Sequence, residues 1–253
     1  MNVQRPLSIR VGLVLAGLAL GSAVLWQTAQ WSRQFALDQI AARSQHTLSL
    51  VVENLGGDLN KFRHLPQVLS ANRRFRSVLR DEATEDEHYA LNEELERINR
   101  ISGALDIYLM DATGLTVAAS NWESEKTFIG KNFGYRPYFK ATLEGRLGRY
   151  FALGTTSGER GYYFAYPIRD RGDVLGAVVV KIQVHHHERK WQTDDHEVIV
   201  VDRFGVIFLS SRPDWQFRTL APLTEAAAAE LKESRRYADR TRTPRRRCSR
   251  PAS

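Results

Sequence analysis

The stretch GRYFALGTTSGERGYYFAYPIRDRGDVLGAVVVKIQV, residues 148–184, decides the fold. Three of its segments, 148–154, 160–170 and 174–184, are rich in apolar and aromatic residues, and turns that contain glycine separate them. Short segments of this kind between turn residues are typical of β-strands. We therefore predict three consecutive strands of an antiparallel sheet.

Two more strands are expected upstream, in LDIYLMDATGLTVAAS, residues 105–120. This segment alternates in hydropathy on both sides of an Asp-Ala-Thr-Gly turn. Two helices are expected before it, over 66–83 and 86–104, and a short helix is expected among the strands at 138–145. Helices followed by five strands predict an α+β fold.

A second, smaller unit is expected after residue 185. In EVIVVDRFGVIFLSS, residues 197–211, two apolar strands flank an Asp-Arg-Phe-Gly turn, and this repeats the pattern of residues 105–120. A further helix is predicted over 222–239. The chain is therefore expected to contain the same strand–turn–strand unit twice.

The N-terminus carries a targeting feature. Residues 11–26 are uncharged and mostly apolar, they follow Arg5 and Arg10, and residues 7–28 extend the run to a length that spans a bilayer. This pattern predicts an uncleaved, single-pass signal anchor in a bacterial inner membrane, with the N-terminus in the cytoplasm and the rest outside. A cleaved signal peptide and a buried core helix are the alternatives.

Residues 30–66 predict one long helix. Apolar and small residues recur along it at a spacing of about three to four, which forms a seam of Leu37, Ala41, Ser44, Leu48, Val51, Leu55 and Phe62. The seam either packs on its own domain or pairs with the same helix of a second copy, which would make a homodimer.

Charge and cysteine content exclude several classes of protein. The chain has 36 Lys and Arg against 29 Asp and Glu, and six of the arginines lie in residues 240–253. The rest of the chain is nearly neutral, so no nucleic-acid partner is expected. The single cysteine, Cys248, excludes an internal disulfide. Residues 241–253 are expected to be a disordered basic tail, which either binds an acidic partner or is an accidental translated end.

Arg136 is the first candidate for a binding residue. It precedes Pro137, which favours an extended conformation at Arg136 and a helix start just after it. Its guanidinium is a planar fork of donors that matches a carboxylate. Thr155, Thr156 and Ser157 lie in a turn and add hydroxyl and backbone donors.

A second cation and aromatic walls complete this candidate site. Along residues 162–166, aromatic side chains alternate between the two faces of a strand, so one face can form an aromatic wall. Lys181 ends an apolar strand. Arg136 and Lys181 together could hold the two ends of a small dicarboxylate. The alternative assigns Arg136 to an internal salt bridge, the tyrosines to the core and Lys181 to the surface.

Metal binding and catalysis find little support in the sequence. Three adjacent histidines, residues 185–187, point in different directions, and no acidic residue stands at a clear ligand spacing. No metal or other cofactor is therefore expected. The chain has no P-loop, no Gly-x-Ser-x-Gly and no His-Glu-x-x-His motif, so an enzyme is not expected either.

Four segments resemble a known family. They are SEKTFIGKNFGYRPYF, GRLGRYFALGTTSGERGYYFAYPI, GAVVVKI and GVIFLSSRPDWQFRTL. These segments look like the sensor region of the C4-dicarboxylate sensor histidine kinases, the DctB family. The resemblance runs from about residue 7 to residue 240 and is strong over 120–220.

The resemblance implies a tandem PAS, or double Cache, sensor in the periplasm whose membrane-distal unit binds succinate, fumarate or malate. Arg136, Thr155 and Lys181 match the family positions that hold the ligand. The expected neighbours of the pocket are Tyr138, Thr156, Ser157, Tyr163 and Tyr166. Residues 1–29 would form the N-terminus and anchor, 30–66 the membrane-proximal helix, 67–184 the ligand-binding unit, 185–240 the smaller unit and 241–253 the tail.

The sequence also departs from that family. No second apolar run, phosphoacceptor helix or Gly-rich ATP-binding region follows residue 240. The chain is therefore expected to bind a ligand without phosphorylating, and a response regulator that controls dicarboxylate transport would be a partner only of a full-length form. A Cache sensor for another small carboxylate or an amino acid, and a non-signalling truncated remnant, are the alternatives.

Overall fold

The structure is a computed structural model, and it describes residues 7–192 and 197–241. The chain divides after Asn54 into two compact units. Helix α1 (Leu7–Phe62) contributes to both units. Its described residues up to Asn54 form the first unit, and its last turns, from Leu55 onward, belong to the second unit. The predicted tail, residues 241–253, lies outside the described residues except at Thr241.

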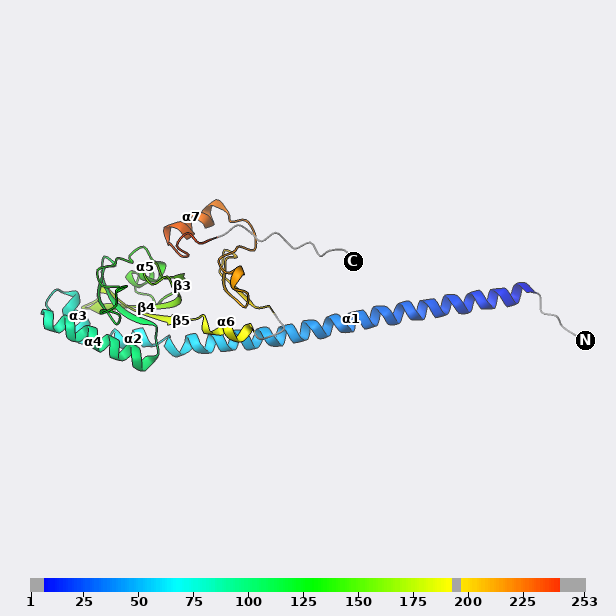
Figure 1. The fold of residues 1–253 in the computed structure, drawn as a ribbon, viewed down its shortest axis with the longest axis horizontal. Helices are drawn as coiled ribbons and strands as arrows, with labels where there is room; N and C mark the ends of the chain where they lie inside the picture. The colour runs from blue at the N-terminus through cyan, green and yellow to red at the C-terminus, as the bar shows by residue number, and fades with distance from the viewer. Residues whose placement is uncertain (1–6, 193–196, 242–253) are drawn as a thin grey trace, which may run out of the picture. The chain divides into compact units, whose positions relative to one another are not determined.

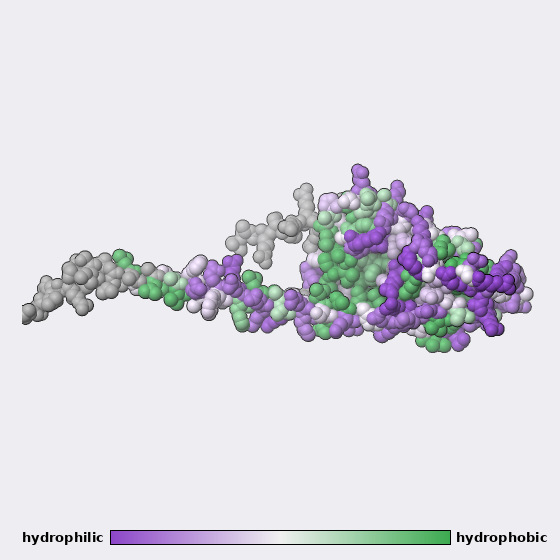
Figure 2. Space-filling view, turned by 180° about the vertical axis from the view of Figure 1, so that it is seen from behind, coloured by the Kyte–Doolittle hydropathy of each residue, from purple (hydrophilic) through white to green (hydrophobic). Residues whose placement is uncertain are grey.

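Helix α1 is continuous over 56 residues, so the predicted anchor and the predicted long helix form a single element (Figure 1). Apolar side chains are exposed along it, among them Phe35, Leu37 and Leu48, and Figure 2 shows apolar and polar residues alternating on its surface. Within the described residues, no helix has a stretch long and apolar enough to cross a membrane. Anchoring and dimerisation through this helix stay predictions.

Three helices follow α1. They are α2 (Leu65–Leu69), α3 (Arg73–Leu79) and α4 (Glu85–Ser102). The prediction of one helix over 66–83 is wrong, because Asn72 adopts an extended conformation and its side chain caps a new helix by accepting from the Arg74 amide. Thr84 and Glu87 form a reciprocal capping box at the start of α4. Gly103, with a φ of 72°, ends it in the left-handed region.

Five antiparallel strands form the main sheet. They are β1 (Asp106–Asp111), β2 (Thr116–Ala119), β3 (Gly148–Leu153), β4 (Arg160–Asp170) and β5 (Asp173–Gln183), in the order β2-β1-β5-β4-β3. The short helix α5 (Pro137–Leu143) precedes β3. All five strands and this helix confirm the sequence-based expectation of a mixed helix and antiparallel-sheet fold.

The two faces of this sheet are covered differently (Figure 1). Helices α2, α3 and α4 and the end of α1 cover one face, where Phe75, Leu91 and Leu95 pack against Phe164 and Val180. Helix α5 and the loop before it cover the other face. There the buried cluster is mostly aromatic and includes Tyr108, Phe128, Phe133, Tyr138, Phe139, Tyr150 and Tyr163. The aromatic face is the one that carries the candidate site.

The second sheet contains β6 (Ile199–Val201) and β7 (Ile207–Ser210). Its turn repeats that of the main sheet in atomic detail. Asp111 Oδ1 accepts from the amides of Thr113 and Leu115 at 2.8 and 2.9 Å. Asp202 Oδ1 accepts from the amides of residues 204 and 206 at the same two distances. The predicted repeat of a strand, an Asp-x-x-Gly turn and a strand is therefore confirmed.

The helix predicted over 222–239 is shorter in the structure, where α7 spans Glu225–Glu233. Beyond it, Arg235, Ala238 and Asp239 have positive φ, so the chain turns repeatedly. The Arg236 carbonyl accepts from the Leu153 amide at 2.8 Å, which joins this turning segment to the end of β3. A long-range contact therefore replaces the last helical turns.

A short helix that the sequence did not predict, α6 (His186–Trp191), connects the two sheets. Glu188 on α6 is buried and accepts from both terminal nitrogens of Arg160 at 2.7 and 2.6 Å. It also accepts from the Ser210 amide at 2.8 Å, and Arg160 donates to the Phe208 carbonyl at 2.7 Å. An ion pair with a buried carboxylate therefore joins β4, α6 and β7.

We expect Glu188→Ala to lower the free energy of unfolding by about 3–5 kcal/mol, because it leaves Arg160, whose side chain is only 13% exposed, without its counter-charge. Glu197→Ala is the matched control, since Glu197 pairs with Arg212 at 3.0 Å with both side chains about half exposed. The control is expected to change the free energy of unfolding by about 0–1 kcal/mol. Urea denaturation followed by circular dichroism measures both, and equal losses would contradict the role of Glu188.

Candidate functional site

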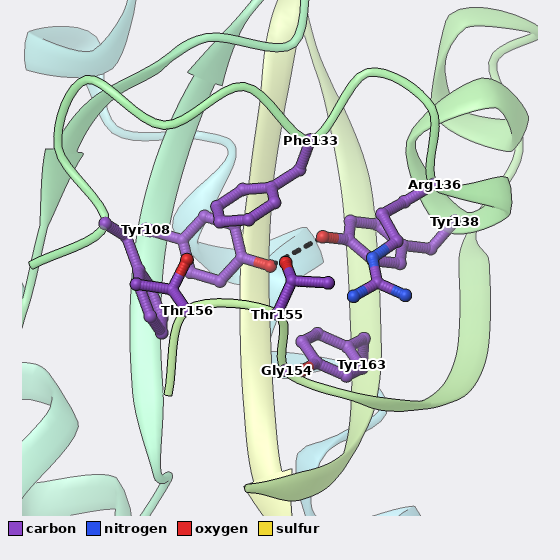
Figure 3. Close-up of a pocket in the computed structure, with 9 residues that line it drawn as sticks. Tyr108, Phe133, Arg136, Tyr138, Gly154, Thr155, Thr156 and Tyr163 are labelled. Atoms are coloured by element: carbon purple, nitrogen blue, oxygen red, sulfur yellow. Dashed lines mark hydrogen bonds between the residues drawn. The ribbon is translucent and has the colours of Figure 1, made fainter. Parts of the chain in front are cut away.

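A pocket lies on the aromatic face of the main sheet, under α5 and the loop between β3 and β4. Figure 3 shows side chains from β1, from the loop before α5, from α5 and from β4 converging on it. Nine residues line it: Tyr108, Phe128, Phe133, Arg136, Tyr138, Gly154, Thr155, Thr156 and Tyr163. Sequence reasoning singled out five of these nine.

Arg136 is the cation of this pocket. It caps α5 with an extended backbone ahead of Pro137, as the sequence predicts, and it is 2% exposed. Its Nη2 donates to the Leu153 carbonyl at 2.9 Å, and its Nη1 donates to the carbonyls of Ser234 and Arg235 at 3.2 and 3.0 Å. These acceptors are neutral, so the alternative of an internal salt bridge for Arg136 finds no carboxylate partner in the described residues.

Arg136 is a permanent cation. Burial lowers its pKa, but the interaction with Tyr138 and other nearby tyrosines opposes this and holds the pKa of Arg136 above its ordinary value. No Asp or Glu stands among the nine lining residues. The pocket therefore carries a positive charge that no acidic side chain in its wall neutralises.

Three buried tyrosines form the inner wall. The hydroxyls of Tyr108 and Tyr138 are 2.8 Å apart and share a hydrogen bond (Figure 3). The rings of Tyr138 and Tyr163 are stacked, with their centres 5.2 Å apart and an angle of 4° between their planes. Burial raises the pKa of all three tyrosines, so their hydroxyls are neutral and can donate hydrogen bonds to an anion.

Lys181 lies beside the pocket and does not line it. It is fully buried, and its Nζ donates to Asp106 at 3.1 Å and to Ser157 at 3.0 Å. The Nζ is also 5.5 Å from the ring centre of Phe128, which does line the pocket. Lys181 therefore has a counter-charge, whereas Arg136 has none among the residues that the structure describes.

Sequence reasoning missed four lining residues, Tyr108, Phe128, Phe133 and Gly154, and it also missed Asp106 beside the pocket. Asp106 faces Lys181 across the β1–β5 pairing, where the two residues are direct partners. Burial raises the pKa of Asp106, and the neighbouring Lys181 opposes this shift. The register of two strands far apart in the sequence was needed to bring the pair together, and no local motif marks it.

The remaining predicted residues fall into three places. Thr155 and Thr156 line the pocket, and the Thr155 hydroxyl lies 3.1 Å from the Tyr135 hydroxyl. Ser157 contacts Lys181 as described. Tyr166 lies on the opposite face of β4, packed against the cluster under α2–α4, so the structure does not bring it to the pocket. Strand alternation separates it from Tyr163, three positions away.

The pocket is nearly filled by its own side chains, and the space between them holds about one water molecule. A larger ligand needs these side chains to move apart. Its lining offers a cation, hydroxyls and aromatic rings but no histidine, cysteine or carboxylate. Such a set can bind an anion through the guanidinium and the hydroxyls.

No protein-family model matches the chain. The C4-dicarboxylate transport sensor protein DctB of Pseudomonas aeruginosa is 38% identical over 219 residues, which cover 87% of this chain and 36% of that protein. The protein of the same name from Rhizobium meliloti is 32% identical over 242 residues, which cover 94% and 38%. The chain thus spans 36–38% of the length of these curated relatives.

Solved structures give a second comparison. The sensor domain of the Vibrio cholerae histidine kinase DctB superposes with a TM-score of 0.75 at 35% identity, over 80% of this chain and 78% of that one. The ligand-binding domain of the Campylobacter jejuni chemoreceptor Tlp3 superposes with a TM-score of 0.52 at 16% identity, over 68% and 70%. The second likeness concerns the fold alone.

We expect Gly148→Ala to distort the pocket, because a Cβ at this position would overlap the backbone carbonyl of Tyr138. The free energy of unfolding should fall by about 1–3 kcal/mol. The control is Gly57→Ala in α1, where a Cβ meets nothing within 4 Å, and this change should stabilise the helix by about 0.5–1 kcal/mol. Urea denaturation compares the two, and an unchanged stability of Gly148→Ala would contradict the close packing of β3 on α5.

A pH titration tests the buried tyrosines. Because the folded-state pKa of Tyr108, Tyr138 and Tyr163 is raised above the ordinary value of about 10, their contribution to stability is complete below pH 10. It is lost as the pH rises further, when the unfolded chain ionises first. Phenolate absorbance of the folded protein should therefore show exposed tyrosines ionising before these three. A single transition of all nine tyrosines near pH 10 in the folded state would contradict this environment.

Proposed function

This chain belongs to the DctB family of C4-dicarboxylate sensor domains, and we propose that its Arg136 pocket binds a small C4-dicarboxylate. The observation that carries this proposal is a buried cation in a pocket whose wall contains no acidic residue. A buried charge without a counter-charge is unfavourable, so an anionic ligand gains from pairing with it.

The first carboxylate of the ligand would pair with the guanidinium of Arg136. The hydroxyls of Tyr108, Tyr138 and Thr155 line the same pocket and would form further hydrogen bonds with this carboxylate. Arg136 is retained in a fixed position by three carbonyl oxygens, which reduces the entropy that binding would otherwise cost.

The second carboxylate would extend past Phe128 toward Lys181. That lysine donates to Asp106 and Ser157, which leaves one of its three N–H donors for a ligand. A ligand with two negative ends would therefore meet Arg136 at one end and a second cation, already paired with Asp106, at the other. Titration with individual dicarboxylates would distinguish among succinate, fumarate and malate as ligands.

Ligand binding at Arg136 would also change hydrogen bonds outside the pocket. The guanidinium contacts the carbonyls of Ser234 and Arg235, and the next carbonyl, that of Arg236, accepts from Leu153 in β3. A carboxylate competes with these carbonyls for the same donors. Ligand occupancy therefore alters the balance between the pocket and the segment after α7, which is a physical basis for signalling.

We place this sensor in a two-component system. In this proposal, residues 67–184 form the ligand-binding unit and 185–240 the smaller unit, outside the inner membrane of a bacterium. The segment 7–28 of α1 anchors the chain, and the part of α1 that follows pairs two copies. The sensor reports to a histidine kinase and a response regulator that control dicarboxylate transport, and these partners belong to the whole protein.

The test is a calorimetric and thermal-shift titration of the chain with succinate, malate and, separately, an amino acid. We expect saturable binding of the dicarboxylates and a loss of affinity of at least about 10-fold in Arg136→Lys, which keeps the charge but not the planar fork. Arg149→Lys is the matched control, because Arg149 is exposed on β3. The affinity of this variant for the dicarboxylates should be unchanged.

Three results would contradict this assignment. Unchanged affinity in Arg136→Lys would place the dicarboxylate elsewhere. Binding of the amino acid but of neither dicarboxylate would favour the alternative Cache ligand, with Asp106 as the acidic group for its ammonium. A folded chain that binds none of the compounds would separate the fold from the ligand.

A further inference from the structure

We propose that Asp58, His186 and His187 form a binding site for a divalent transition-metal ion, with Zn²⁺ as its best-fitting occupant. Asp58 lies in the last turns of α1, within the second unit, and the two histidines open α6. This site is separate from the Arg136 pocket and does not depend on the function proposed for it.

The geometry of the three side chains supports this assignment. Nε2 of His186 is 3.0 Å and Nε2 of His187 is 3.1 Å from the same oxygen, Oδ2 of Asp58. One ligand atom from each residue lies within 4.8 Å of the others. Ligand atoms around a tetrahedral zinc ion, with bonds of about 2.0–2.1 Å, are about 3.3 Å apart. Small outward movements of the three atoms would make room for the ion.

The local backbone explains how adjacent histidines converge, which the sequence-based expectation of different directions did not foresee. His185 is the residue before the helix, and its ring contacts Gln183 at 2.9 Å. His186 and His187 fall in the first turn of α6, and their ring centres are 4.0 Å apart. Two of the three histidines therefore share one direction, toward α1.

The chemistry of the ligand atoms also fits a metal such as zinc. Imidazole nitrogens and a carboxylate oxygen are ligands that zinc accepts readily, and magnesium and calcium prefer oxygen alone. Lys61 pairs with the other oxygen of Asp58, Oδ1, so Oδ2 remains the shared atom of the two histidines. A monodentate carboxylate and two imidazoles supply three of four tetrahedral positions.

Exposure leaves a route for the ion and for a fourth ligand. The His187 side chain is 4% exposed, whereas those of His186 and Asp58 are 32% and 30% exposed. The cluster is thus closed on one side and open to solvent on the other, where a water molecule could complete the coordination. A half-open cluster of this kind can load an ion without unfolding.

The position of the cluster gives the ion a structural consequence. His187 directly precedes Glu188, the residue that joins the main sheet and the second sheet through Arg160 and Ser210. A metal bridge from Asp58 to this turn of α6 would fasten the end of α1 to the junction of the two sheets. Metal binding is therefore expected to stabilise the folded chain.

The experiment uses the purified full chain in detergent, without an added histidine tag, after treatment with a chelator. Zinc chloride is titrated by calorimetry and by thermal shift, with magnesium chloride in parallel. We expect one zinc ion per chain, a rise in melting temperature that EDTA reverses, and no response to magnesium. Cobalt(II) should give the visible absorption of a tetrahedral site.

Variants locate the site. Asp58→Asn and His186→Gln, both at partly exposed positions, should each weaken zinc binding by at least about 10-fold. His185→Gln is the matched control, because the ring of this neighbouring histidine contacts Gln183 and is not part of the cluster. The zinc affinity of this variant should be unchanged. Absence of one-to-one zinc binding, or equal affinity in the unaltered chain and in both ligand variants, would overturn the proposal. Circular dichroism confirms that each variant is folded.

Discussion

Burial of the Arg136 guanidinium constrains the positions of three parts of the chain at once. An unsatisfied buried charge is costly, and the structure answers with carbonyl oxygens from the end of β3 and from the turn after α7. The backbone of α5, the last residue of β3 and the segment 234–236 are therefore positioned together. Because none of these acceptors carries a charge, the pocket keeps a net positive character, and this property is the basis of the function proposed for it.

The two cations of this region illustrate how charge compensation shapes recognition. Lys181 has a carboxylate partner in Asp106, across a pair of neighbouring strands, while Arg136 has neutral partners alone in the described residues. An incoming anion gains more from the second kind of cation, since it displaces no existing ion pair. The aromatic wall adds to this by excluding water and lowering the local dielectric, which strengthens the interaction of Arg136 with any anion.

Helix α6 is the other centre of the structure, although it has only six residues. Within one turn it holds Glu188, which joins both sheets, and the two histidines that face Asp58 on α1. The two sheets contain the same Asp-x-x-Gly turn, in which the aspartate side chain accepts from the amide four residues further on. Their connection differs in kind, because it depends on an ion pair with a buried carboxylate and on contacts from distant parts of the chain.

The sequence by itself determined the local elements. Alternation of apolar residues predicted two of the five strands, and apolar segments between glycine-containing turns predicted the other three. Arg-Pro predicted the start of α5, the two Asp-x-x-Gly turns predicted a repeat, and the quoted motifs indicated the family. These features depend on a few neighbouring residues, so a short pattern reports them. Five of the pocket residues were found in the same way, from Arg136 through Tyr163.

Tertiary structure alone decided the partners. Arg136 meets Ser234, 98 residues away, and His186 meets Asp58, 128 residues away. The pairing of Asp106 with Lys181 required the strand register, and the shortening of α7 required a contact with β3. The packing of α5 decided that the pocket lies on the face of β4 that carries Tyr163 and not on the face that carries Tyr166. Such contacts arise from the packing of the whole chain, and no short sequence pattern carries that information.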